Sequence, residues 1–282
     1  MIVERPNIDQ KYVEDRISVL DQQIRECSLD APNNIRAARQ LPALMLTRLN
    51  HLLASRQQDW RVAEKAAANV LDAYETLVHL VGRDRGGNSG SRGPGLVDSA
   101  DWPQPDRRYR ATMTPSDFFT AYWIATILGD SRRLSLLAET PVENFVTPGV
   151  EADRFLYIWI ETLQRFHSRD RQWVQLLGDT IYFSDPARVE VASTDALHYL
   201  LYPPIKLFYT LISGTEGEFN YELEDALVRH NYYWSSVGER KLASEGWVSL
   251  PLTAIACMAL GKGYAVVPES GYLPLALGLE KG

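Results

Sequence analysis

The chain is poor in the residues that build cross-linked, metal-binding or redox sites. Only 2 cysteines occur in 282 residues, Cys27 and Cys257, and no second thiol lies near either of them. This spacing argues against a disulfide framework and a cysteine zinc site, and it suits a reducing compartment. The 5 histidines are scattered, and none pairs with another at metal-ligand spacing. The sequence therefore predicts neither a metal nor a cofactor.

Motifs for covalent catalysis are also missing. The chain has no Gly-x-Ser-x-Gly turn, and Cys257 lies in an apolar run, AIACMA, where burial would raise the pKa of the thiol and keep it unreactive. His198 falls in an apolar helix and is predicted to be a core or packing histidine, and His230 is predicted to make a buried hydrogen bond. We therefore expect a protein without catalytic activity.

No apolar run is long enough to cross a bilayer. The longest, Leu197–Ile212 and Trp247–Leu260, fall short of the roughly 20 residues that a membrane helix needs. The segment Met1–Pro6 lacks the basic stretch and apolar run of a secretory signal. These features predict a cytoplasmic protein that does not enter the membrane.

The negative charge is concentrated in one half of the chain. Residues 1–141 carry 18 basic and 18 acidic side chains, whereas residues 142–282 carry 11 basic and 18 acidic ones, so the whole net charge of −7 falls in the second half. Such a surface repels nucleic acid and anionic lipid and attracts a basic partner over a distance. An acidic composition with no such role is the alternative explanation.

What the sequence does contain is helical periodicity. From Asp9 to Cys27 the apolar side chains recur every three to four residues, which is typical of an amphipathic helix. Similar spacing predicts helices over residues 34–55, 59–81, 118–128, 131–139, 151–166, 170–183, 194–201, 203–212, 218–234 and 248–260. The short segment Tyr264–Val267 is expected to form either an isolated strand or an extended tail. The sequence therefore predicts an all-α fold, either a multi-helix bundle or a stack of helix hairpins.

A segment rich in glycine and proline divides these helices into two groups. Residues 82–113 contain the run GGNSGSRGPG and too little apolar surface to offset the loss of conformational entropy on ordering, so a flexible loop or linker is predicted there. It separates an N-terminal helical region, residues 1–81, from a C-terminal helical region, residues 114–282.

The second helical region contains the candidates for contact with a partner. Glu218, Glu222 and Asp225 share one helical face, which favours a solvated acidic surface over a catalytic pair of carboxylates. Such a surface suits a basic partner. Tyrosine and tryptophan are common anchors of interfaces, and the candidates are Tyr221, Tyr232, Trp234 and Tyr272.

The C-terminal third resembles a known family. The similar segments are LYPPIKLFY at residues 201–209, EFN at 218–220, DALVRHNYYW at 225–234, LPLTAIACMA at 250–259 and PESGYLP at 268–274. They resemble the immunity protein 49 family of bacterial polymorphic toxin systems, and the similarity spans about residues 115–277. The resemblance implies an immunity protein that binds a cognate antibacterial toxin, occludes its active site and so protects the producing cell in interbacterial competition. It also adds Glu269 to the expected contacts, and the acidic half favours a basic toxin such as a nuclease.

Two other functions stay open at this point. One is a cytoplasmic hydrolase whose site residues are scattered along the chain, and the other is a helical scaffold without a toxin partner. The neighbouring gene would separate them, because a toxin domain encoded there supports inhibition and a metabolic operon does not.

Overall fold

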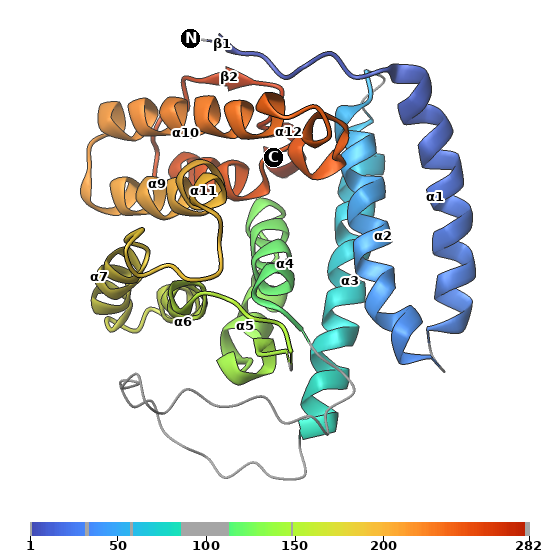
Figure 1. Cartoon of the computed structure of the whole chain (residues 1–282), viewed down its shortest axis with the longest axis horizontal. Helices are drawn as coiled ribbons and strands as arrows, with labels where there is room; N and C mark the ends of the chain where they lie inside the picture. Colours follow the sequence, from blue (N-terminus) through green and yellow to red (C-terminus); the bar gives the residue numbers. More distant parts are fainter. Residues whose placement is uncertain (1, 32–33, 57–58, 86–112, 148, 280–282) are drawn as a thin grey trace.

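The computed structural model describes residues 2–31, 34–56, 59–85, 113–147 and 149–279. In this part of the chain helices dominate, and the single sheet pairs two strands of two residues each. The all-α class predicted from the sequence is confirmed. The three long helices lie side by side along one edge of the molecule (Figure 1): α1 (Gln10–Asp30), α2 (Ile35–Ala54) and α3 (Trp60–Arg85).

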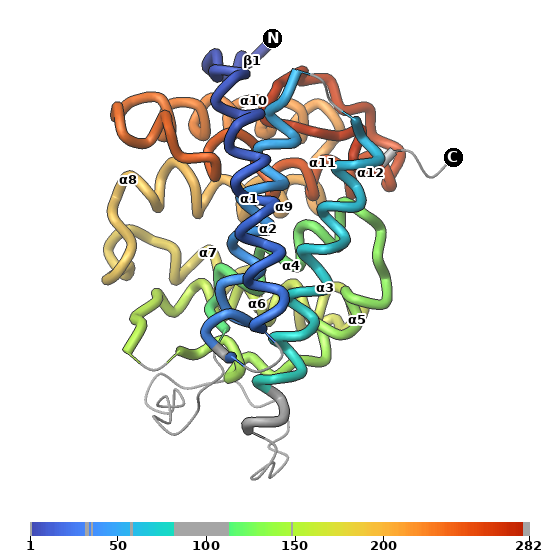
Figure 2. The backbone as a smooth tube through the Cα atoms, turned by 90° about the vertical axis from the view of Figure 1, so that its right-hand side faces the viewer, coloured from blue at the N-terminus to red at the C-terminus, as the bar shows by residue number. Residues whose placement is uncertain are grey.

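The later part of the chain consists mostly of shorter helices, which pack beside these three (Figure 2). They are α4 (Pro115–Ile127), α5 (Ser131–Glu139), α6 (Arg154–His167), α7 (Trp173–Phe183), α8 (Thr194–Ala196), α9 (Tyr202–Ser213), α10 (Glu216–Ser236), α11 (Leu250–Gly261) and α12 (Ala276–Leu279). A π-helical turn, Leu197–Leu201, joins α8 to α9, and 3₁₀ turns lie at Val142–Phe145, Arg240–Leu242 and Ser244–Gly246.

Helix α4 lies at the centre of the fold because it is apolar on nearly every side. Thr114 and Asp117 form a capping box at its start, in which each side chain accepts a hydrogen bond from the backbone of the other residue. Phe118, Tyr122 and Ile124 are almost fully buried. A helix that is apolar all round belongs in the interior, and α4 contacts both α3 and α11.

Both helical regions contribute to one hydrophobic core. Leu71 and Val78 of α3 belong to the same buried cluster as Phe118, Phe208 and Ile255 from the second region. The packing of α3 therefore depends on residues that follow the predicted linker.

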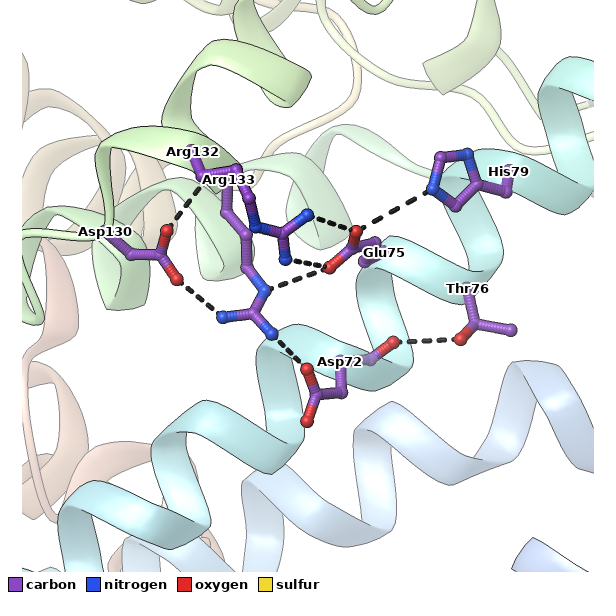
Figure 3. Close-up of polar contacts among 7 residues, drawn as sticks. All are labelled: Asp72, Glu75, Thr76, His79, Asp130, Arg132 and Arg133. Carbon is purple, nitrogen blue, oxygen red and sulfur yellow. Dashed lines mark hydrogen bonds and ion pairs between the residues drawn. The ribbon is translucent and has the colours of Figure 1, made fainter.

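An ion-pair network fastens α3 to the start of α5 (Figure 3). The guanidinium of Arg133 contacts Asp72, Glu75 and Asp130, and its side chain is only 15% exposed. Arg132 donates two hydrogen bonds of 2.6 Å to Glu75. Hydrogen bonds from Arg132, and then from Arg133, lower the pKa of Glu75 to about 2 against the opposing effect of burial. Each of the three carboxylates and two guanidinium groups in this network thus lies beside a group of opposite charge, which indicates that the network has a structural role in joining α3 to α5.

The short sheet pairs residues from near the two ends of the described chain. Strand β1 (Ile2–Val3) pairs in parallel with β2 (Glu269–Ser270), and the Ser270 hydroxyl donates to the Val3 carbonyl at 2.7 Å. Of the two forms expected for Tyr264–Val267, the structure shows no strand but a segment without regular secondary structure. The strand forms a few residues later, at Glu269–Ser270, where a partner edge is available. That edge comes from the distant N-terminal end of the described chain.

The predicted linker differs from the structure at both of its edges. Gly82 was expected to end the third helix, but α3 continues to Arg85. A glycine costs only about 1 kcal/mol within a helix, a cost that packing elsewhere along the helix can offset. Met113 is fully buried, and its carbonyl accepts a hydrogen bond from Thr147 at 2.8 Å. Residues 86–112 lie outside the described residues, so the flexible linker stays a prediction there.

Candidate functional site

Helix α10 carries most of the predicted contact residues. It begins with a capping box in which Glu218 accepts a 2.7 Å hydrogen bond from the Thr215 backbone and Thr215 accepts one from Glu218. Phe219, Leu223 and Leu227 are buried along its inner face. The opposite side is the surface that a partner can reach, and we call it the outer face of α10; it comprises Glu218, Tyr221, Asp225, Val228 and Tyr232.

The sequence suggested that Glu222 belongs to a solvated acidic surface, but the structure places it elsewhere. Its side chain is only 7% exposed, and its carboxylate forms an ion pair of 2.7 Å with the Lys206 ammonium of α9. With 3.6 residues per turn, Glu222 lies on the side of the helix that turns toward buried Phe219 and Ala226. The neighbouring helix covers it there, so it joins α9 to α10.

Glu218 and Asp225 lie on the outer face, and both have partners within the chain. Glu218 is exposed, and hydrogen bonds from Thr215 lower its pKa. Asp225 accepts a 2.7 Å hydrogen bond from the Arg229 guanidinium one turn later. The exposed carboxylate of Glu216 adds further negative charge at the start of the helix.

Two tyrosines dominate the outer face. Tyr221 is 74% exposed and Tyr232 is 54% exposed, although both are large side chains with much apolar surface. The ring of Tyr232 lies 4.8 Å from the ring of Tyr199, which belongs to the π-helical turn. Such turns are frequent at functional sites. Tyr199 was not among the contact residues predicted from the sequence. The only signal was its position shortly before the Pro203–Pro204 pair, which could have indicated an irregular helix.

The other predicted contact residues have different surroundings. Tyr272 is fully buried, its hydroxyl donates to Asn231 at 2.8 Å, and burial raises its pKa to about 12. Trp234 is partly buried, and Gly246 lies against its ring. A Cβ atom added at Gly246 would lie only 2.4 Å from the nearest atom of the Trp234 ring. Glu269 is exposed on β2. The structure thus brings Tyr221 and Tyr232 together with Glu218 and Asp225, whereas Glu269 lies on another element.

A pocket of about 350 Å³ opens beside Tyr199. The first turns of α4, α9 and α11 meet there, and each contributes proline, a residue that suits a first turn because it needs no N–H partner there. The walls are mainly apolar: leucine and proline side chains form much of them, together with the aromatic residues Phe119, Trp123, Trp159, Tyr199 and Trp234. Asn50, His230 and the exposed Glu245 supply polar groups.

Polar atoms without partners distinguish this pocket. Among the described residues, buried side-chain atoms that lack a hydrogen-bond partner are Asn50 Oδ1, His51 Nε2 and Trp234 Nε1. Asn50 and Trp234 line the pocket, and Asn50 is only 2% exposed. Sequence analysis missed Asn50 because one asparagine within an amphipathic helix gives no signal.

His230 is buried and Cys257 is partly buried. His230 is buried with Nε2 3.1 Å from the Gly246 carbonyl, as predicted, and burial lowers its pKa to about 4. His198 was predicted to be a core or packing histidine, but it is exposed on the π-helical turn. Burial raises the pKa of Cys257 to about 11, which keeps the thiol protonated and unreactive near pH 7.

The described ranges contain neither a candidate metal cluster nor a helix suited to a membrane. No three His, Cys, Asp or Glu side chains placed there lie close enough together to hold a metal ion. Nor does any helix there combine the length and apolar character needed to span a bilayer.

Among the described residues, fold and surface together define a nearly all-helical protein that has two exposed tyrosines on one helix face and a largely apolar pocket. The chain belongs to the immunity protein 49 family, whose model matches residues 46–277. The match begins within α2, so it extends well before residue 115, where the resemblance described in the sequence begins. Comparisons with curated proteins and with solved structures found no match.

Proposed function

We propose that this chain is an immunity protein that binds a cognate antibacterial toxin domain in the cytoplasm, occludes its active site and has no catalytic activity of its own. The family match over residues 46–277 carries this proposal. An exposed pair of tyrosines on a helix that is otherwise well packed also supports it, because tyrosine is a frequent anchor of protein interfaces.

The outer face of α10 is the proposed contact surface. It combines the aromatic anchors Tyr221 and Tyr232 with carboxylates at Glu218 and Asp225, and it lies in the half of the chain that carries the net charge of −7. A basic toxin, such as a nuclease, would be attracted to this surface.

Co-expression with the toxin domain encoded beside its gene tests the proposal. We expect this chain to restore growth to cells that produce the toxin domain, and the purified proteins to form a stable complex. The chain by itself should show no nuclease, protease or acyl-transfer activity. Failure to bind and to protect would refute the proposed function.

Surface charge should act mainly on the rate of association. Replacing the two carboxylates of the outer face, by Glu218→Gln and Asp225→Asn, should slow association several-fold at low ionic strength, where steering can raise the rate constant toward about 10⁸ M⁻¹s⁻¹. The difference should shrink as salt shortens the Debye length. Surface-based kinetics at several ionic strengths would measure both effects.

Helix α1 provides a control of equal charge, because Glu14 and Glu26 are exposed there along the other edge of the molecule (Figure 1). Changing these two residues to glutamine should alter association much less. Equal slowing by the two double variants would show that only the net charge matters and that α10 is not the contact surface.

Truncating an anchor should act on dissociation instead. We expect Tyr232→Ala to weaken binding by about 2 kcal/mol or more, chiefly through faster dissociation, because a central tyrosine loses buried contact area. Tyr182 on α7 is a matched control, since it is 55% exposed against 54% for Tyr232. Tyr182→Ala should leave the dissociation rate unchanged; the same loss in both variants would argue against the α10 face.

A further inference from the structure

Tyr232, near the C-terminal end of the outer face of α10, packs against a ring from another element. Its ring centroid lies 4.8 Å from that of Tyr199, and the two ring planes are tilted by 43°. Aromatic pairs at such separations attract each other beyond the effect of buried area alone. Tyr221, at the other end of the face, has no such ring contact among the described residues. The two exposed tyrosines therefore differ in how they are supported.

Tyr199 belongs to a well-packed part of the fold. It lies in the π-helical turn, which continues without a break from α8 into α9. Leu197 in the same turn is only 2% exposed and belongs to the hydrophobic core, and Leu201 packs against that core. The backbone N–H of Tyr202 donates to the Leu197 carbonyl and closes the turn. Because its neighbours fix the turn, Tyr199 projects from a defined position.

The exposure of the two rings indicates which one supports the other. Tyr199 is partly buried and also lines the pocket, whereas Tyr232 is 54% exposed. Packing leaves a partly buried ring few rotamers, while an exposed tyrosine exchanges between several. The contact therefore limits the motion of Tyr232 more than that of Tyr199.

Restricting an interface side chain before binding strengthens the complex. A side chain that becomes fixed only on binding loses rotamer freedom, and this loss of entropy opposes association. Tyr232 has lost part of that freedom in the free protein, because the ring of Tyr199 occupies one side of it. Without Tyr199, the same anchor would bind the toxin less tightly even if its own contacts were unchanged.

We propose that Tyr199 is a positioning residue for toxin binding: its ring holds the exposed ring of Tyr232 in the orientation in which the toxin meets it. The role in binding rests on the proposed function. The restriction of Tyr232 is a property of this chain alone, so it can be measured without the toxin.

Two substitutions separate the ring of Tyr199 from its bulk. Tyr199→Leu keeps an apolar side chain beside the pocket but removes the ring, whereas Tyr199→Phe keeps the ring and removes only the hydroxyl. Only the leucine variant should release Tyr232. Thermal unfolding of both variants would show whether each one folds.

Fluorine NMR of the full chain labelled with 3-fluorotyrosine provides the measurement without toxin. We expect the ring current of Tyr199 to shift the signal of Tyr232, which is identified by its loss in Tyr232→Phe. The signal should move toward that of free 3-fluorotyrosine in Tyr199→Leu and stay near its wild-type position in Tyr199→Phe. A Tyr232 signal that is the same in Tyr199→Leu as in wild type would overturn the proposal.

A reciprocal variant keeps this measurement decisive if Tyr199→Leu does not fold. Tyr232→Leu changes an exposed side chain, so it should leave the fold intact. The signal of Tyr199, identified by its loss in Tyr199→Phe, should then move because the ring of Tyr232 is gone. An unchanged signal would show that the two rings are not packed together, and the proposal would fail.

A double-mutant cycle tests the role of Tyr199 in the complex with the toxin domain encoded beside the gene. We expect Tyr199→Leu to weaken binding about three- to tenfold, as for the loss of order in one interface side chain, and Tyr199→Phe to leave it unchanged. In a Tyr232→Ala background, Tyr199→Leu should have little further effect, because the side chain that it positions is already absent.

The outcomes of the cycle separate this role from the proposed function. The toxin can bind wild type and Tyr199→Leu equally, or Tyr199→Leu can weaken binding as much in the Tyr232→Ala background as in wild type. In either case Tyr199 does not act through Tyr232, and the inference fails while the proposed function stands. If the toxin does not bind wild type, the proposed function fails and this role fails with it, even where the fluorine signals show the two rings in contact.

Discussion

Phe208→Ala should lower the free energy of unfolding by about 3–5 kcal/mol, the range found when a buried phenylalanine is truncated. Phe208 is fully buried on α9, and its ring packs edge-on against Trp159 at 5.2 Å and against Phe166 at 5.0 Å. Alanine would remove these contacts and leave a cavity that rigid aromatic neighbours cannot fill. Urea denaturation of both proteins would measure the loss.

The next residue along the chain is the control. Tyr209 is 49% exposed, so Tyr209→Ala should change the free energy of unfolding by no more than about 0.5 kcal/mol. If both variants lost similar stability, Phe208 would not occupy the core of this fold. The loss in Phe208→Ala should also appear without any change in the denaturant slope, because the overall burial stays similar.

Arg133→Ala should cost about 2–3 kcal/mol of stability. The arginine is largely covered and contacts Asp72, Glu75 and Asp130, so its removal leaves three carboxylates close together (Figure 3). Hydrogen bonds between charged groups contribute about 1.5–3 kcal/mol, and unpaired like charges add repulsion. Arg132→Ala should cost less, because that side chain is 63% exposed and its pairing with Glu75 is weakened by solvent.

The same network predicts how stability changes with pH. The folded protein holds the pKa of Glu75 at about 2, below its usual 4.5, so the stability that Glu75 contributes is fully present above pH 4.5. It is lost as the pH falls from 4.5 toward 2, because the unfolded chain takes up the proton first. The stability difference between wild type and Glu75→Gln should therefore shrink across this window.

Thermal unfolding at a series of pH values would follow this difference. Glu14→Gln, at an exposed position on α1, is the control and should show little dependence on pH. A difference between wild type and Glu75→Gln that stayed constant from pH 7 to pH 2.5 would contradict the assigned ion pairs.

Local sequence predicted the helices well because each signal lies within a few residues of its effect. Thr114 and Asp117 are three residues apart, and together they form the cap that starts α4. The helix predicted over residues 218–234 is likewise present as α10, and His230 makes the buried hydrogen bond that was expected. The family resemblance also rested on local segments, and the family match confirms it.

The sequence by itself therefore determined the helical class and the family, since periodicity, caps and motif segments are local properties of the chain. Only the tertiary structure decided which polar side chains meet solvent. Glu222 looked like part of an acidic face, but α9 covers it and supplies Lys206, and Tyr272 looked like an anchor but lies buried against Asn231. Asn50 and Trp234 come from helices far apart in sequence, and the shared pocket exists because packing brings α2 and α10 to the same place. Such long-range juxtapositions depend on the path of the whole chain, which no local pattern encodes.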